Sequence, residues 1–218
     1  MTLADRLAAV QAGVADAAAR ADRDPASITT VVVTKFHPAA LVRELHALGV
    51  RDFGESRHQE AQPKVAELAD LDGITWHFIG QLQSKKARQV AEYADLVHSF
   101  DRESLVGPLA GSRVFIQVNL TDDPERGGVA PGGIDALAEA AAAGGLEVLG
   151  LMAVAPLGAE PRPAFARVRE LSERLTRTLP AATALSMGMS GDYADAILEG
   201  ATHLRIGTAI TGIRPPKG

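Results

Sequence analysis

Residues 28–35 read Ile-Thr-Thr-Val-Val-Val-Thr-Lys, a run of β-branched residues that ends in a lysine. Valine, isoleucine and threonine favour extended backbone, and a short apolar run is typical of a strand buried on both faces. Pro38 follows three residues later, where it suits the first turn of a helix. The stretch therefore predicts a buried strand, a lysine at its carboxyl end, and a helix that follows it.

The same unit recurs along the rest of the chain. Before the first strand, residues 2–20 place Leu3, Leu7, Val10 and Val14 three or four positions apart, which indicates one apolar helix face. Gly54 is expected to end the second strand. Further strands are predicted at 50–53, 74–79, 96–100, 113–118, 146–152, 184–187 and 203–206, and helices at 38–48, 55–70, 82–93, 101–110, 131–143 and 162–179.

Strict alternation of strands and helices favours a parallel sheet with helical crossovers. Eight such units without a long linker favour closure over an open doubly wound sheet. We therefore expect an α/β protein with a single-domain (β/α)8 TIM barrel that spans residues 1–218 and has an N-terminal helix in residues 1–24.

Composition excludes several classes of function. Hydrophobic residues make up 46% and charged residues 22% of the 218, as in an ordinary globular protein. The net charge of −5 and the 4% of aromatic residues argue against a nucleic-acid partner. No stretch is apolar for long enough to cross a membrane, and no signal peptide is evident. These features, with the absence of cysteine, predict a cytoplasmic protein.

Motifs of several enzyme classes are missing from the sequence. Without cysteine, there is no thiolate nucleophile, and no His/Asp/Glu cluster has the spacing of a metal site. The chain also has no G-x-G-x-x-G, P-loop or G-x-S-x-G motif. His77 lies in an alternating strand and is interpreted as a core histidine. We expect no metal.

In a (β/α)8 barrel, functional residues lie at the carboxyl ends of the strands. Lys35 is in such a position, where it points into or over the barrel mouth. Desolvation there lowers the pKa of a lysine and leaves its amine free to attack a carbonyl. The alternative is a lysine that simply reaches solvent.

A phosphate site is predicted where the last two strands end. Gly207 lets the backbone approach a ligand closely, Thr208 adds a hydroxyl at a helix start, and Arg205 points inward on the last strand. Ser186 and Ser190 follow the seventh strand. The alternatives are a tight turn with Arg205 in a structural ion pair, and Ser190 as an ordinary helix cap.

Six stretches in this order resemble the pyridoxal phosphate homeostasis protein family, also called the proline synthase co-transcribed proteins. The resemblance covers essentially the whole chain. It rests on VVVTK (31–35), FGES with QE (53–60), WHFIGQLQSKK (76–86), GLMAV (150–154), LSMGMSGDY (185–193) and HLRIGTAITG (203–212).

The resemblance implies a barrel like the N-terminal domain of alanine racemase and a role in vitamin B6 homeostasis. It implies pyridoxal 5′-phosphate (PLP) held as a Schiff base on Lys35. Ser186, Gly207 and Thr208, with Ser190 close by, are implied to hold the phosphate. Arg205 is implied to face the pyridine nitrogen, where a permanently cationic group disfavours the protonated ring on which most PLP enzymes depend.

Three positions depart from the family pattern. Ser56 replaces the usual asparagine, which puts in question the contact of that side chain with the cofactor. His37 replaces a second lysine, and Ser84-Lys85-Lys86 replaces the usual Asn-Lys after LQ.

The leading hypothesis is a non-catalytic, monomeric protein that buffers PLP or delivers it to PLP-dependent apoenzymes. One alternative is an amino-acid racemase, which needs a second acid–base residue, usually a tyrosine from an additional domain. The chain ends soon after the eighth strand, so we expect no such domain, and Tyr93 and Tyr193 stand in unmatched contexts. The other alternative is a barrel that binds a different phosphate ligand, or that serves mainly as an interaction surface.

Overall fold

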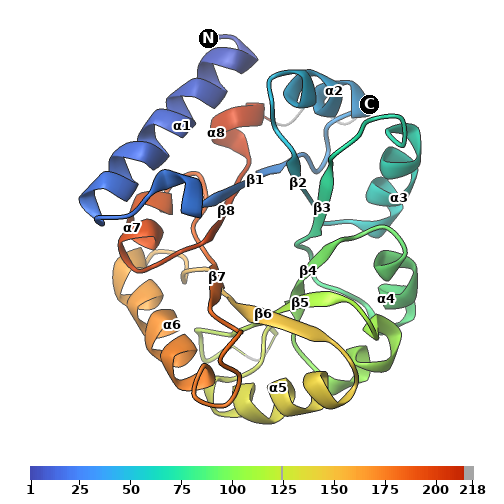
Figure 1. The fold of residues 1–218 in the computed structure, drawn as a ribbon, viewed down its shortest axis with the longest axis vertical. Coiled ribbons are helices and arrows are strands. Elements are labelled where there is room, and N and C mark those ends of the chain that lie inside the picture. The colour runs from blue at the N-terminus through green and yellow to red at the C-terminus, as the bar shows by residue number, and fades with distance from the viewer. Residues whose placement is uncertain (124, 214–218) are drawn as a thin grey trace.

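The computed structural model, which describes residues 1–123 and 125–213, is a closed barrel of eight parallel strands in sequence order (Figure 1). Residues 124 and 214–218 of the expected domain lie outside this description. The predicted (β/α)8 fold is confirmed. The strands are β1 (Thr29–Val33), β2 (Asp52–Glu55), β3 (Thr75–Phe78), β4 (Leu96–Phe100), β5 (Arg113–Gln117), β6 (Glu147–Met152), β7 (Ala184–Ser186) and β8 (His203–Ile206).

Helices surround the barrel, as the view down its axis shows (Figure 1). Buried apolar residues of the helices and of the strands form one large core cluster between the two layers. The helices are α1 (Leu3–Arg20), α2 (Ala39–Ala47), α3 (His58–Glu67), α4 (Ser84–Ala91), α5 (Ile134–Ala143), α6 (Pro161–Leu175), α7 (Tyr193–Leu198) and α8 (Thr208–Thr211).

Closure of the barrel joins the first strand to the last. Thr29 of β1 is in register with His203 of β8, and Val32 is in register with Ile206. The residues that follow β1 and β8 therefore start from neighbouring points on the barrel mouth.

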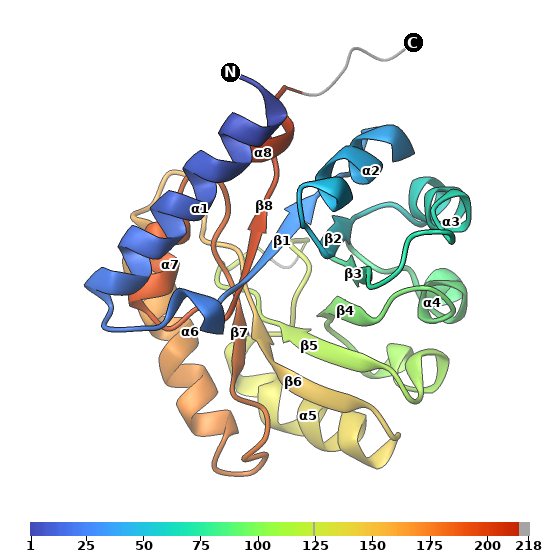
Figure 2. The same cartoon turned by 45° about the horizontal axis from the view of Figure 1, so that its top comes forward.

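The first helix, α1, packs beside α7 and α8 on the outside of the barrel (Figure 2). It begins with a capping box, in which the Thr2 hydroxyl accepts from the Asp5 backbone N–H and the Asp5 carboxylate accepts from the Thr2 N–H. Its predicted apolar face is buried at Leu7, Val10 and Val14. Among the described residues, no helix has the length and apolar character needed to cross a membrane.

Two local predictions are wrong. Residues 101–110 form two short 3-10 turns instead of a helix, since Pro108 and Gly107 interrupt the segment. Gly54 does not end β2 but lies inside it, paired with His77. A Cβ at Gly54 would lie 3.1 Å from a Val31 methyl carbon, so a residue without a side chain fits the crowded barrel interior there.

The inside of the barrel is unusually polar for this fold, in which branched apolar residues usually dominate. Its apolar cluster is small and centres on Leu96, Phe115 and Met152. Beside it lie five buried or largely buried polar side chains, which are His77, His98, Ser186, His203 and Arg205.

Candidate functional site

A cavity opens at the carboxyl ends of the strands, where the sequence predicts the functional residues. Its lining includes five of the predicted site residues, namely Lys35, Ser190, Arg205, Gly207 and Thr208. The remaining lining residues are Val33, Ile79, Met152, Val154, Met189 and Gly191. The cavity thus combines one amine, one guanidinium, two hydroxyls and an apolar wall.

Lys35 lies at the rim of this cavity, two positions beyond the end of β1. The residue as a whole is exposed, so the expected desolvation of its amine is wrong for this structure. The physical reason is its place after the strand, where the chain has already left the barrel interior. The residue therefore both lines the cavity and meets solvent.

A buried ion pair fixes the backbone immediately before Lys35. Lys64 Nζ lies 2.5 Å from Glu55 Oε1 and 2.9 Å from the Thr34 carbonyl oxygen, to both of which it donates. The Thr34 hydroxyl donates to the same Glu55 oxygen at 2.7 Å. Burial raises the pKa of Glu55, against the opposing effect of Lys64. This network holds the end of β1, and with it the start of the Lys35 side chain.

The residue after Lys35 is held in an uncommon conformation. Phe36 has a φ of +69°, in the left-handed region that non-glycine residues rarely adopt. Its N–H donates to Glu60 Oε2 at 3.2 Å, and the Arg57 guanidinium lies 4.8 Å from the centre of its ring. The chain therefore turns sharply after Lys35, and contacts from α3 hold that turn.

Small residues and hydroxyls form the part of the cavity beside β7 and β8. A Cβ added to Gly191 would meet no atom within 4 Å, so this wall is open. Ser190 Oγ accepts from the Ala209 N–H at 3.3 Å and ties the loop after β7 to the start of α8. Helix α8 has only four residues, Thr208–Thr211, so the dipole of this helix contributes little here. The useful donors are the hydroxyls and loop N–H groups.

Arg205 is buried and points inward, as predicted. Its Nη1 donates to the Ser186 carbonyl and hydroxyl oxygens, both at 2.7 Å, and its Nη2 donates to the Ala153 carbonyl at 2.9 Å. Burial lowers the pKa of Arg205 to about 10, so it stays charged at neutral pH. The alternative of a structural ion pair is not seen among the described residues, because these partners are neutral.

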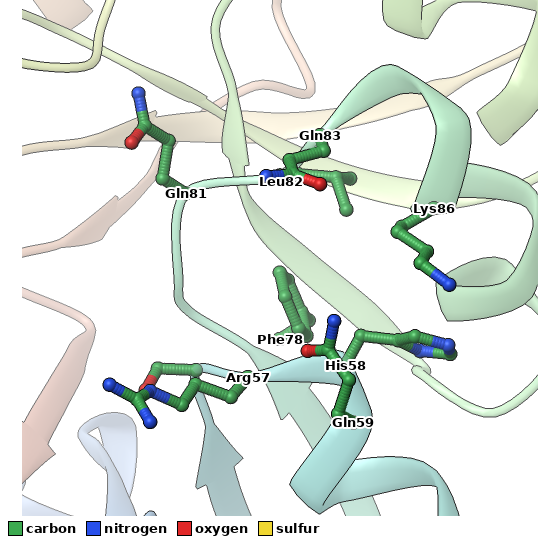
Figure 3. A pocket seen from close by; sticks show the side chains of 9 residues that line it. Arg57, His58, Gln59, Phe78, Gln81, Leu82, Gln83 and Lys86 are labelled. Atoms are coloured by element: carbon green, nitrogen blue, oxygen red, sulfur yellow. The ribbon is translucent and has the colours of Figure 1, made fainter.

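The structure does not bring Ser186 or Ser56 into the wall of this cavity. Ser186 is fully buried, and its hydroxyl is engaged by Arg205 and by His98 Nδ1, each at 2.7 Å. Ser56 lines a second cavity with residues that follow β2 and β3, among them Gln59 and Gln81 (Figure 3). The two serines lie at strand ends, as the sequence indicates, but spacing alone does not reveal which cavity a side chain reaches.

Sequence reasoning missed several residues that shape the site. Lys64 acts from α3, and nothing in its spacing marks it. Glu60, on the same helix, belongs to the stretch 53–60 that carries the resemblance, but no contact with the chain after Lys35 is predicted for it. His98 lies in strand β4, where a polar residue inside a fully buried strand could have indicated a side chain in the barrel interior. His77, interpreted as a core histidine, is buried and bonded to His98 and Asp52, which confirms that interpretation.

Known proteins resemble this chain over almost its whole length. Residues 6–215 match the family model of the alanine racemase N-terminal domain. The pyridoxal phosphate homeostasis protein of Pseudomonas aeruginosa is 46% identical, over 98% of this chain and 96% of its own. The protein of that name from Escherichia coli is 37% identical, over 97% of each chain.

Solved structures show the same fold. PipY of Synechococcus elongatus, known with and without bound PLP, has a TM-score of 0.85 and 37% identity, over 97% of this chain and all of its own. Alanine racemase of Corynebacterium glutamicum has a TM-score of 0.69 at 17% identity, over 99% of this chain and 62% of its own, and shares the fold alone. The chain belongs to the pyridoxal phosphate homeostasis protein family, within the larger family of alanine racemase N-terminal domains.

Proposed function

We propose that this chain binds PLP covalently on Lys35 in the cavity at the carboxyl ends of the strands, and that it serves intracellular PLP homeostasis. The observation that carries the proposal is that Lys35, Ser190 and Thr208 line one and the same cavity. Relatives that carry the name pyridoxal phosphate homeostasis protein support it, as does PipY, whose structure was determined with PLP bound.

The chemistry of the cavity fits a phosphorylated aromatic aldehyde. The open wall at Gly191 and the hydroxyls of Ser190 and Thr208 offer space and donors for a phosphoryl group. Ile79 and Met152 offer apolar contact for an aromatic ring. Arg205 adds a cation, which donates hydrogen bonds only and so favours an unprotonated ring nitrogen beside it. Ser186 then acts on the cavity through its hydrogen bond with Arg205. Ser56 lies in the loop after β2 and lines the neighbouring cavity.

When bound, PLP supplies an aldehyde that condenses reversibly with the Lys35 amine and releases one water. The protein's residues perform the rest of the task. The Glu55–Lys64 pair holds the backbone from which Lys35 extends, and the loops after β7 and β8 orient the phosphoryl group. Because Lys35 is exposed at the rim, a group held there would remain accessible to amines in solution.

A carrier fits the described residues better than a racemase. Racemases of this fold need a second acid–base residue across the cofactor. Tyr93 stacks on His58, with ring centroids 6.0 Å apart, and the Tyr193 hydroxyl lies against α1 at Gly13. Neither tyrosine lines the cavity. We therefore propose a non-catalytic protein, which acts as a cytoplasmic monomer and hands PLP to PLP-dependent apoenzymes.

Borohydride trapping tests the proposal. Purified protein is loaded with PLP and reduced, and its intact mass and peptide map are measured. We expect one adduct, on Lys35, which is lost in Lys35→Ala but kept in Lys85→Ala, a change of an exposed lysine on α4. Alanine racemization should not exceed the rate of free PLP. An adduct on another lysine, or no adduct, would contradict the cofactor assignment, and fast racemization would contradict the carrier role.

A further inference from the structure

Five polar side chains form a continuous line through the barrel interior. Four of them, from four different strands, are at most 5% exposed, while the last, Asp52, retains 31% side-chain exposure at the amino end of β2. The links are Arg205 Nη1–Ser186 Oγ at 2.7 Å, Ser186 Oγ–His98 Nδ1 at 2.7 Å, His98 Nε2–His77 Nδ1 at 2.9 Å and His77 Nε2–Asp52 Oδ1 at 3.0 Å.

We propose that this line is a one-way hydrogen-bond chain, by which Asp52 at the amino end of the barrel positions the Arg205 guanidinium in the cavity at the other end. We call it the Arg205–Asp52 chain. Its effect on a ligand rests on the proposed function, since the cavity must take PLP for Arg205 to face the ring.

The direction follows from which groups can donate. A guanidinium has no acceptor, so Arg205 must donate to Ser186 Oγ. The Ser186 proton is then free to go to His98 Nδ1, which must accept. In a neutral imidazole the other nitrogen carries the proton, so His98 Nε2 donates to His77 Nδ1. By the same rule, His77 Nε2 carries a proton that only an acceptor can receive.

The carboxylate of Asp52 is that acceptor, and it fixes the order of the whole chain. In the reverse order, Asp52 Oδ1 and His77 Nε2 would be two acceptors facing each other, and neither of the groups bonded to Ser186 Oγ could accept its proton. In the forward order each buried donor meets an acceptor. The two links between neutral groups, Ser186–His98 and His98–His77, need no charged histidine.

The surroundings of His98 agree with a neutral ring. Burial, followed by the effects of His77 and Arg205, lowers the pKa of His98 well below its usual value. His203 acts in the same direction, and its ring lies 6.2 Å from that of His98. In a chain with neutral histidines, the charges lie at the two ends, a cation in the cavity and an anion at the far mouth.

Nitrogen NMR of the cofactor-free protein tests the direction without any variant. In the wild type we expect the proton of both His77 and His98 on Nε2. A proton on His98 Nδ1 would overturn the proposal, because Ser186 could not then relay a hydrogen bond from Arg205 to the histidines.

Two changes of Asp52 separate its acceptor role from its size. Asp52→Leu removes the acceptor, and we expect the His98 signals to shift and the PLP dissociation constant to rise roughly five-fold, the equivalent of one hydrogen bond. Asp52→Asn keeps an acceptor oxygen and should restore both measurements to near wild type. Asp16→Leu, on the exposed side of α1, is the control and should change neither.

Unchanged His98 signals in Asp52→Leu would overturn the chain, and so would shifted signals with unchanged PLP affinity, since the chain would then not reach the cavity. Failure of the wild type to bind PLP would overturn the proposed function instead. The NMR result would still decide the direction of the chain.

Discussion

Thr208 and Lys35 follow neighbouring strands, β8 and β1, and so face the same cavity from adjacent points of its rim. An amine alone would capture aldehydes of many kinds. In the proposed site, the hydroxyls of Thr208 and Ser190 add selectivity, because they favour a ligand that carries a phosphoryl group. Affinity at this site should therefore depend on single hydroxyl groups.

Replacing Thr208 by valine removes its hydroxyl and keeps its shape. Because hydrogen bonds to charged groups contribute about 1.5–3 kcal/mol, we expect PLP to bind roughly ten-fold or more weakly, with unchanged thermal stability. Equilibrium titration followed by absorbance measures the change. Thr183→Val, at an exposed position before β7, is the matched control. If Thr208→Val and the wild type bound PLP equally well, the phosphate site would have to lie elsewhere.

Strand β6 depends on one glycine for its fit against β7. Gly150 has a φ of +152° and pairs with Ala184, and a Cβ there would lie 1.8 Å from the Ala184 carbonyl oxygen. Gly111 also has a positive φ, +83°, but an added Cβ would meet open space. Comparing substitutions at these two glycines therefore separates the effect of a positive φ from the effect of a steric clash.

We expect Gly150→Ala to lower the free energy of unfolding by about 3 kcal/mol or more, since backbone of both strands must move. Gly111→Ala should cost only about 1 kcal/mol, the usual effect of a left-handed conformation. Urea denaturation of both variants gives the comparison. Equal losses would mean that the β6–β7 contact relaxes without strain.

Sequence reasoning predicts elements well where local signals are strong. The limits of β4 and β8 match the prediction, and α1 begins one residue later than expected, after the cap at Thr2. It fails where a tertiary contact decides, as at Gly54, which looks like a strand end but fits inside β2 because Val31 crowds it. Lys64 likewise reaches the end of β1 only through the fold.

At the scale of the whole molecule, the polar barrel interior links stability to pH. Burial lowers the pKa of His203 to about 4 from its usual 6.5. The folded protein therefore resists protonation of His203, while the unfolded chain takes up the proton below about pH 6.5. The contribution of His203 to the free energy of unfolding is fully present above pH 6.5 and is lost as the pH falls towards 4. His98, whose pKa is also lowered, acts in the same direction.

We expect the free energy of unfolding to fall by up to about 3 kcal/mol between pH 7 and pH 4 through His203 alone. His203→Gln, which does not titrate, should show a flatter profile, with the part that belongs to His98 remaining. Urea denaturation at intervals across this range measures both curves. Parallel curves for the wild type and His203→Gln would contradict the assignment.

The Arg205–Asp52 chain also restricts how this barrel can change over evolutionary time. Each inner member donates one hydrogen bond and accepts one along the chain, so a single replacement leaves a neighbour without its hydrogen-bond partner. Substitutions there become acceptable in combination, when donor and acceptor change together. Among related sequences we therefore expect Asp52, His77, His98 and Ser186 to vary as a set, while the apolar positions beside them drift independently.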